Sequence, residues 1–408
     1  MASRFGLFLI ASLLAAGWPG VAARAAQPEP FPVATDIRLG GDDGQTRFVV
    51  DLTRKIDLHA FTLADPYRVV IDLPQITFAV PPKTGESGRG LVSAFRYGLV
   101  MKGGSRIVLD LKKPVKIEQA FVLDSAAGQP ARLVLDLAAT DRATFLRAIA
   151  QENRTPRPDP RKSEPRASLA PGARDPRPLI VIDPGHGGLD TGTKSPGGDI
   201  EEKAIVLEFG VLLRDELEKS GKFRVAVTRT DDTFVALGDR VAFARQRDAA
   251  LLISLHADWL SKREGDAQGA TVYTLSEKAS DAEAARLADA ENRADVIAGI
   301  DLSNEPSDVA DILLDLAQRE TKTFSHQFAR GLVAELQRSI RLHRHPLRSA
   351  GFKVLRAPDV PSVLVELGYV SNKQDLKALM SDAWRTKAAR TIAQAVDKFF
   401  ARRLAGAP

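Results

Sequence analysis

The chain contains no cysteine among its 408 residues. Disulfides therefore cannot stabilise it, and any metal site must be built from histidine and carboxylate side chains. Beyond residue 26 there is no uninterrupted run of 18 apolar residues, so we expect a mature chain without a transmembrane helix. The net charge is only +5, and the basic residues are dispersed apart from one Arg-rich linker, which argues against nucleic-acid binding.

The first 26 residues have the pattern of a secretory signal peptide. Arg4 gives a positive start, residues 5–18 form an apolar stretch, and residues 23–25 (ARA) form a small-residue cleavage site. A single arginine precedes the apolar stretch, so the twin-arginine export route is not indicated. We therefore expect the protein to be exported, with residues 1–26 removed.

A hexamer that begins with arginine and ends with Asp-Leu occurs four times before residue 140. The residues between Arg and Asp are apolar and often β-branched, which is typical of short strands. The copies form two pairs, with a spacing of 21 residues in the first and 26 in the second. We predict a small all-β sandwich over residues 30–140, in which the Arg and Asp side chains have a structural role. The four copies cover residues 47–52, 68–73, 106–111 and 132–137.

The following segment, 141–178, is predicted to be a linker, because seven prolines lie between residues 152 and 178. From residue 179 strands and helices alternate, which predicts a three-layer α/β/α sandwich over 179–404. Residues 259–321 are interpreted as an insertion that the sheet does not need. The expected strands cover 179–183, 223–228, 251–256, 352–355 and 362–367, and the expected helices cover 203–219, 236–247, 323–338 and the residues from about 383.

Four ionisable residues lie at the ends of these elements. His186, His256 and Glu366 follow buried strands, and Glu202 lies at the start of a helix. In open α/β sheets, ligands bind in the crevice beyond the carboxyl ends of the strands. Two imidazoles and a carboxylate can hold zinc with one position open, while a further glutamate transfers a proton. The pattern therefore predicts a zinc hydrolase.

Each of these residues also has a structural alternative. Glu202 could stabilise the helix N-terminus, and the spacing does not distinguish it from Glu201. Glu366 could pair with a nearby arginine, since an unpaired buried carboxylate is costly. A single histidine is more often a packing residue than a ligand, but two of the six histidines share the strand-end position. The other four lack this setting and are expected on the surface or in packing: His59, His326, His343 and His345.

The same residues carry a resemblance to a known family. The segments IDPGHGG (182–188), Glu202-Lys203, SLHAD (254–258) and VLVELGYVSN (363–372) resemble the ordered motifs of type 3 zinc-dependent N-acetylmuramoyl-L-alanine amidases. The β-region at 30–140 resembles the AMIN domain that often precedes such catalytic domains.

The resemblance implies hydrolysis of the amide between N-acetylmuramic acid and L-alanine in peptidoglycan, for wall remodelling and daughter-cell separation. It implies one zinc ion per catalytic domain, held by His186, Glu202 and His256, with Glu366 as the catalytic carboxylate. It further implies a periplasmic location and an AMIN-like domain that targets the enzyme to the wall or the division site.

The insertion contains a candidate regulatory residue. Residues 280–283 (SDAE) predict a capped helix start, and the apolar stripe that follows includes Ala284, Leu287, Ala288 and Ala298. Glu291 falls in the middle of this stripe, whereas the capping role already explains Glu283. A second helix is expected from about Ser307.

Relatives controlled by LytM-domain activators carry an inserted helix whose glutamate blocks the zinc. The resemblance therefore implies that Glu291 occupies the fourth zinc position at rest and that an activator displaces the helix. The alternative is a solvated Glu291 at the edge of the stripe.

Two other functions are compatible with parts of the pattern. A zinc carboxypeptidase acting on peptidoglycan would usually take a glutamate from an H-x-x-E turn, but Leu189 stands at that position. A non-catalytic wall-binding protein with a decayed site is disfavoured because all four proposed site residues are present.

Overall fold

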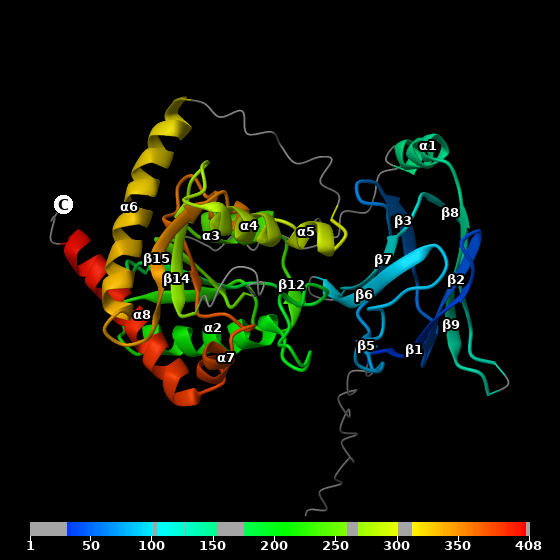
Figure 1. The fold of residues 1–408 in the computed structure, drawn as a ribbon, viewed down its shortest axis with the longest axis horizontal. Coiled ribbons are helices and arrows are strands. Elements are labelled where there is room, and N and C mark those ends of the chain that lie inside the picture. Colours follow the sequence, from blue (N-terminus) through cyan, green and yellow to red (C-terminus); the bar gives the residue numbers. More distant parts are fainter. Residues whose placement is uncertain are drawn as a thin grey trace, which may run out of the picture. The chain divides into compact units, whose positions relative to one another are not determined.

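The N-terminal region folds as two sheets that are antiparallel except at one edge of each, where the short strands β5 and β12 run parallel to β1 and β6, and β12 comes from the later part of the chain. The computed structural model describes residues 31–100, 104–126, 128–152, 175–258, 268–300 and 312–404 (Figure 1). The first sheet has the order β5-β1-β2-β9-β8, and the second has β6-β7-β4-β3 with a short fifth strand, β12, beside β6. Their bounds are β1 Val33–Gly41, β2 Gln45–Leu52, β3 His59–Leu63, β4 Arg68–Pro74, β5 Thr77–Phe78, β6 Val92–Val100, β7 Gly104–Leu111, β8 Val115–Leu123, β9 Ala131–Ala139 and β12 Thr233–Phe234.

The four hexamer copies form the central strands of these two sheets. β2 pairs with β9 and β4 pairs with β7, both antiparallel, so the arginine of one copy lies opposite the aspartate of another. Arg47 Nε lies 2.6 Å from Asp136 Oδ1, and Arg106 Nε lies 2.6 Å from Asp72 Oδ1. The apolar residues between them fill a shared core between the sheets. Cross-strand ion pairs and a common apolar face thus stabilise the predicted sandwich.

The second region is built on one six-stranded mixed sheet of order β11-β10-β13-β16-β14-β15. β11, β10, β13 and β16 run parallel, β14 is antiparallel to β16, and β15 is parallel to β14. The bounds are β10 Leu179–Pro184, β11 Arg224–Val227, β13 Leu251–His256, β14 Ala270–Leu275, β15 Leu342–Ala350 and β16 Ser362–Glu366.

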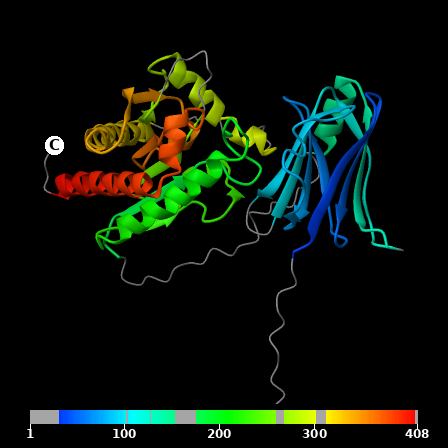
Figure 2. The ribbon, with the colours of Figure 1, turned by 60° about the horizontal axis from the view of Figure 1, so that its bottom comes forward.

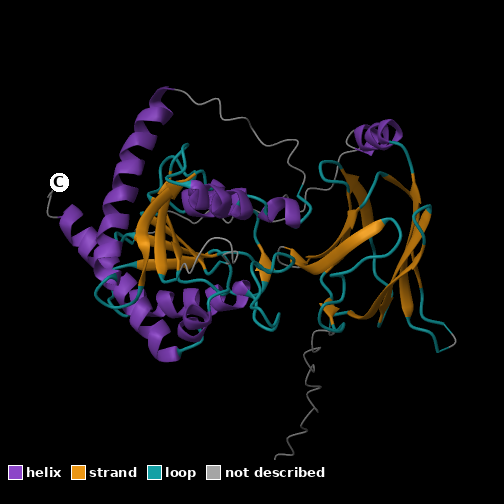
Figure 3. Ribbon diagram, in the orientation of Figure 1, coloured by secondary structure: helices purple, strands orange, loops and turns teal. Residues whose placement is uncertain are grey.

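Helices cover both faces of this sheet, which confirms the predicted α/β/α sandwich (Figure 3). Ile180 and Ile182 of β10 pack toward one helical layer, in which the long helices α2 and α8 lie side by side (Figure 2). Leu179 and Val181 pack toward the other layer. Burial on both faces explains why the central strands are continuous apolar runs. The helices are α2 Glu202–Glu218, α6 Ile312–Leu336, α7 Lys373–Leu379 and α8 Asp382–Leu404 on one side, and α3 Leu237–Gln246, α4 Ala282–Glu291 and α5 Ala294–Ile297 elsewhere.

Several local predictions differ from the structure. Residues 352–355, predicted as a strand, contain the 3-10 helix η3 (Lys353–Leu355), because their apolar side chains pack into a core cluster as a buried turn. The edge strand is β15 instead. The insertion at 259–321 contains β14, which lies between β16 and β15, so the sheet does include part of it. Helix α6 begins at Ile312 rather than near residue 323.

A helix, α1 (Arg142–Glu152), lies in the first part of the segment predicted as a linker. Phe145 of α1 is buried against Tyr67, with ring centroids 5.2 Å apart. The predicted signal peptide (1–26), the remainder of the linker from residue 153 to 174 and the predicted helix start near Ser307 lie outside the described residues. Among the helices that the structure describes, none combines the length and the apolar character needed to cross a membrane.

Candidate metal centre

Glycines on both sides of His186 allow the site to form. β10 ends at Pro184, and His186 then adopts a left-handed conformation with φ of +58°. A Cβ added at Gly185 would lie 2.4 Å from Cε1 of His256. A Cβ added at Gly192 would lie 2.7 Å from Glu202 Oε2. Only glycine therefore permits the two imidazoles and the carboxylate to approach this closely.

Two buried arginines hold the turn that carries His186. Arg240 is 2% exposed and donates hydrogen bonds to Asp183 Oδ1 at 2.7 Å and to the carbonyl of His186 at 2.8 Å. Arg229 donates to the carbonyl of Gly185 at 2.8 Å. Burial raises the pKa of Asp183, but Arg240 and two hydroxyl donors outweigh it and lower that pKa. These contacts satisfy buried carbonyls around a strained residue, so both arginines are positioning residues.

Four side chains converge beyond the carboxyl edge of the sheet. His186 Nε2 lies 3.1 Å from Glu202 Oε1 and 3.6 Å from Glu291 Oε2. His256 Nδ1 lies 3.4 Å from Glu202 Oε1 and 3.1 Å from Glu291 Oε2. His186, His256 and Glu291 form a group able to hold a metal ion, with one ligand atom each within 4.8 Å of the others. The structure thus brings together three predicted ligands and the predicted regulatory glutamate.

The donor set fits a zinc-sized cation. His186 Nε2 and His256 Nδ1 are buried and have no hydrogen-bond partner among the described residues. A tetrahedral zinc with bonds of about 2.0–2.1 Å holds its ligand atoms about 3.4 Å apart, close to the separations found here. Burial disfavours a charged His186, but Asp190, Glu202 and Glu291 raise its pKa well above the ordinary value. The surroundings therefore favour positive charge at this point.

A second set of hydrogen bonds orients His186 and Glu202. His186 Nδ1 lies 2.9 Å from Asp190 Oδ2, which fixes the ring so that Nε2 faces the cluster. Glu202 is completely buried, and its carboxylate accepts hydrogen bonds from the Ala257 amide at 2.8 Å and the Thr193 amide at 2.9 Å. Such outer contacts set both the orientation and the basicity of metal ligands.

Replacing Asp190 by asparagine is expected to weaken zinc binding about 10- to 100-fold, since the amide cannot hold the His186 ring as a charged acceptor. Competition with a chromogenic chelator measures the change. Asp199 lies exposed in the same loop, so Asp199→Asn is the matched control and should bind zinc like the unaltered protein. An equal zinc affinity in both variants would contradict the role given to Asp190.

The structure also distinguishes the position of Glu202 from that of its neighbour Glu201. Glu201 forms ion pairs with Lys194 at 3.3 Å and Lys203 at 3.5 Å, pointing away from the imidazoles. The four remaining histidines lie in other places: His59 begins β3, His326 lies in α6, and His343 and His345 lie in β15.

Glu366 ends β16 directly beside His256, its register partner on β13. It is fully buried, with Oε2 accepting from the Asp258 amide at 3.1 Å and Oε1 without a hydrogen-bond partner in the described part of the chain. Burial, together with the negative charges of Asp258, Glu202 and Glu291, raises the pKa of Glu366 well above its usual value. Among the residues that the structure describes, this carboxyl forms no salt bridge, so the arginine pair of the alternative interpretation is not found there.

Glu291 is the last residue of α4 and is only 7% exposed, so it is not the solvated residue of the alternative interpretation. The helix start differs from the prediction. Asp281, not Ser280, is the N-cap and accepts from the Glu283 and Ala284 amides. Glu283 instead pairs with the buried Arg348 at 2.7 Å.

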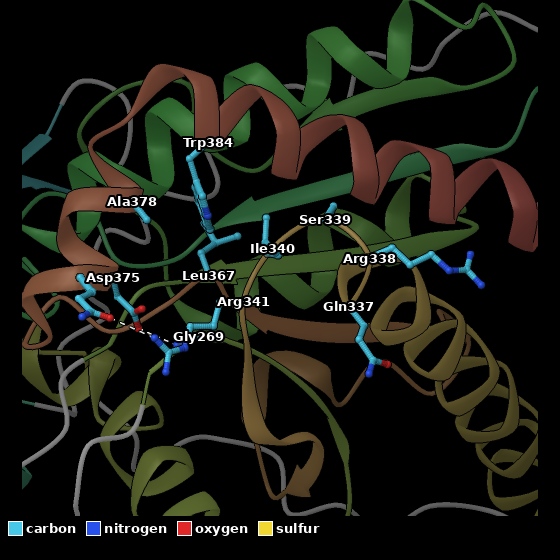
Figure 4. Close-up of a pocket in the computed structure, with 11 residues that line it drawn as sticks. Gly269, Gln337, Arg338, Ser339, Ile340, Arg341, Leu367, Asp375, Ala378 and Trp384 are labelled. Carbon is cyan, nitrogen blue, oxygen red and sulfur yellow. Dashed lines mark hydrogen bonds between the residues drawn. The ribbon is translucent and has the colours of Figure 1, made fainter.

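A cavity of about 460 Å³ lies away from these residues, where α6 leads into β15. Figure 4 shows Trp384 and Leu367 together on its wall and Asp375 beside Gly269. The Asp375 carboxylate is occupied by backbone amides, accepting from Gly269 at 2.8 Å and from Tyr369 at 3.1 Å. This cavity contains none of the predicted site residues.

Fold and site together define an α/β domain with a buried His/Glu cluster able to hold a metal ion, preceded by an all-β domain. The model of the N-acetylmuramoyl-L-alanine amidase family matches residues 180–398, more than half of the chain, and the AMIN domain model matches residues 36–143. The chain therefore belongs to the N-acetylmuramoyl-L-alanine amidase family and carries an AMIN domain. It is an enzyme of that class.

Individual relatives agree with this assignment. The chain is 33% identical to N-acetylmuramoyl-L-alanine amidase AmiC of Neisseria meningitidis, over 93% of this chain and 92% of the relative. It is 32% identical to the AmiC of Escherichia coli, over 90% of this chain and 89% of the relative. A solved structure, amidase AmiC2 of Nostoc punctiforme, is 27% identical with a TM-score of 0.39, covering 55% of this chain and 98% of that one. The two AmiC relatives do not favour the carboxypeptidase or the non-catalytic alternative.

Proposed function

We propose that the chain is a zinc-dependent amidase that hydrolyses the bond between N-acetylmuramic acid and L-alanine in periplasmic peptidoglycan, during wall remodelling and daughter-cell separation. One observation carries the zinc proposal: His186 Nε2, His256 Nδ1 and Glu202 Oε1 converge at separations that suit a single cation, and the two nitrogens have no hydrogen-bond partner among the residues that the structure describes. The names of the two AmiC relatives support the substrate.

His186, His256 and Glu202 would hold the zinc ion. When bound, zinc supplies Lewis acidity that polarises a carbonyl and acidifies water. Glu366 would accept the proton of the attacking water through its unpartnered Oε1 and return it to the leaving amine. Burial beside other carboxylates favours the protonated form of Glu366, which is the form that gives the proton to the leaving amine. Asp190 and the backbone amides of Thr193 and Ala257 would keep the ligands oriented.

Glu291 would keep the enzyme inactive in its resting state by occupying a ligand position of the zinc ion. Its Oε2 lies 3.1 Å from His256 Nδ1 and 3.6 Å from His186 Nε2, where a fourth ligand would stand. Because α4 must move to release this carboxylate, a partner that binds the insertion would activate the enzyme. By resemblance to regulated relatives, this partner is a LytM-domain activator.

The remaining proposals concern the whole chain. Residues 1–26 would direct export, the AMIN region would bring the enzyme to the wall, residues 141–178 would link the two regions, and residues 179–404 would carry catalysis. Binding of the full-length chain to insoluble peptidoglycan, with and without residues 30–140, tests the targeting role.

Metal content and product identity on purified sacculi test the proposed reaction. We expect one zinc per chain, loss of activity on chelation, and recovery when zinc is returned. The expected products are free stem peptides and glycan chains that retain their muramic acid. A Glu291→Ala chain run in parallel prevents the resting block from hiding activity. Release of single amino acids would instead identify a carboxypeptidase.

A further inference from the structure

Three arginines of the AMIN domain donate hydrogen bonds to backbone carbonyls of the insertion that contains Glu291. Arg68 of β4 donates to the carbonyl of Val296 at 2.6 Å, and Arg96 of β6 donates to the carbonyl of Ile297. Arg106 of β7 donates to the carbonyls of Ala298 and Gly299 at 3.1 and 3.2 Å. Residues from Pro32 onward form one compact unit, which includes both sides of this contact. We call these residues, Arg68, Arg96 and Arg106, the arginine clamp.

The clamp donates hydrogen bonds to the carbonyl groups at the end of α5, a helix that begins three residues beyond Glu291. The last carbonyls of a helix have no partner within the helix, and cationic donors are favourable there. Helix α5 is only one turn long (Ala294–Ile297) and cannot be stable without such contacts. Two of the clamp guanidinium groups are themselves fixed, Arg106 by Asp72 at 2.6 Å and Arg96 by Asp110 at 2.9 Å. The donors are therefore held in place before they meet the helix.

Apolar packing surrounds the clamp. Val70 and Val108 of the second AMIN sheet belong to the same core cluster as Ala294 and Ala298 of the insertion. A Cβ added at Gly299 would lie 2.8 Å from Val70 Cγ2 and 3.1 Å from Val108 Cγ2. The segment thus fits closely against the sheet at this point.

The arginines of the hexamer repeat make different contacts in the two sheets. Arg47, in the first sheet, pairs with Asp136 across β2 and β9, and its side chain is largely exposed. Arg106 occupies the equivalent position in the second sheet and also contacts α5. The cross-strand ion pair with an aspartate therefore accounts for the position of Arg47, but it is only part of the role of Arg106.

We propose that the second AMIN sheet is a docking surface for the segment 282–300 and that the arginine clamp restrains Glu291 in its inhibitory position. This inference rests on the proposed resting block by Glu291. Opening of the metal site then requires α5 to leave the AMIN domain, so the AMIN domain is an inhibitory element as well as a targeting one.

The test uses the full-length chain with the double substitution Arg96→Ala/Arg106→Ala. Because charge-assisted hydrogen bonds are lost, amide hydrogen exchange within residues 282–300 should become about tenfold faster. Release of dye-labelled fragments from sacculi without an activator should rise by a similar factor. The matched control, Arg38→Ala/Arg47→Ala, removes the arginines at the corresponding positions of the first sheet and should leave both measurements unchanged. Gly299→Leu disrupts the same contact by a change in the insertion. It should also accelerate hydrogen exchange and dye release, although the AMIN domain is unaltered.

Unchanged exchange at 282–300 in both the double variant and Gly299→Leu would overturn the clamp. The same substitutions are then placed in a Glu291→Ala background, where they should give no further activity. A further rise there would show that the clamp does not act through Glu291, which also overturns the inference. If Glu291→Ala alone gave no activation, the resting block would be wrong, while hydrogen exchange would still decide whether the clamp holds the segment.

Discussion

Replacing Glu366 by glutamine should lower amide hydrolysis about a thousandfold, the size typical for loss of a general acid–base group. The amide has the same shape, but it cannot take the proton of water or pass one to the leaving amine. Glu366 is not among the converging ligand atoms, so zinc content should stay at one ion per chain. Turnover on purified sacculi and metal analysis of the same sample provide the two measurements.

His256→Ala is the informative comparison, because it removes one of the converging nitrogens and should lose both zinc and activity. Thermal unfolding separates catalytic loss from misfolding. Glu366 is a buried acid beside three other carboxylates, so a neutral amide in its place should not lower the melting temperature. Comparable zinc loss in the two variants would contradict the assignment of Glu366 to proton transfer.

Three residues of the site, His186, His256 and Glu366, could be predicted because they end or follow strands that are buried on both faces. Such strands are continuous apolar runs, so an ionisable residue that ends one is conspicuous in the sequence. His256 and Glu366 end β13 and β16, and their positions are register partners in the sheet. β14 (ATVYTL) is rich in strand-forming residues, but its place between β16 and β15 depends on tertiary pairing that the sequence does not show.

Other features depend on contacts that the sequence does not reveal. Arg229 and Arg240 hold the His186 turn, yet in the sequence they are ordinary arginines beside polar neighbours. The sequence gives one indication of this role: Arg240 lies on the buried face of the short helix α3. Glu201 and Glu202 are adjacent, so only the direction of the first turn of α2 separates them. The predicted apolar stripe crosses from α4 to α5, but the helix breaks at Asn292 and Arg293.

Replacing Glu291 by alanine should raise activity without an activator about a hundredfold, the change expected when a mostly closed population becomes mostly open. The carboxylate lies within 3.6 Å of both ligand nitrogens, and its removal leaves that position for water and substrate. The measurement is the initial rate of dye release from labelled sacculi, at saturating zinc so that a weaker metal affinity does not mask the gain.

The rest of α4 should remain in place in this variant. Arg348 holds its start through Asp281 and Glu283, and Asn292 holds its end by donating to the Gly351 carbonyl at 2.9 Å. Asp289 is an exposed carboxylate on the same helix, so Asp289→Ala removes equal charge without touching the site and should stay at the basal rate. Equal rates for Glu291→Ala, Asp289→Ala and the unaltered chain would show that Glu291 does not limit activity.

If Glu291 blocks a coordination position of the zinc ion, its removal should also improve the binding of a small zinc ligand. A change in wall binding alone would not have this effect. A small hydroxamate needs only free access to the metal, and it has no contact with the glycan or stem peptide. It should therefore bind the Glu291→Ala chain much more tightly than the unaltered chain, in the absence of any substrate. If the variant hydrolysed sacculi faster but bound the hydroxamate no better, the gain would come from the wall-binding surface, and Glu291 would not be the fourth ligand at rest.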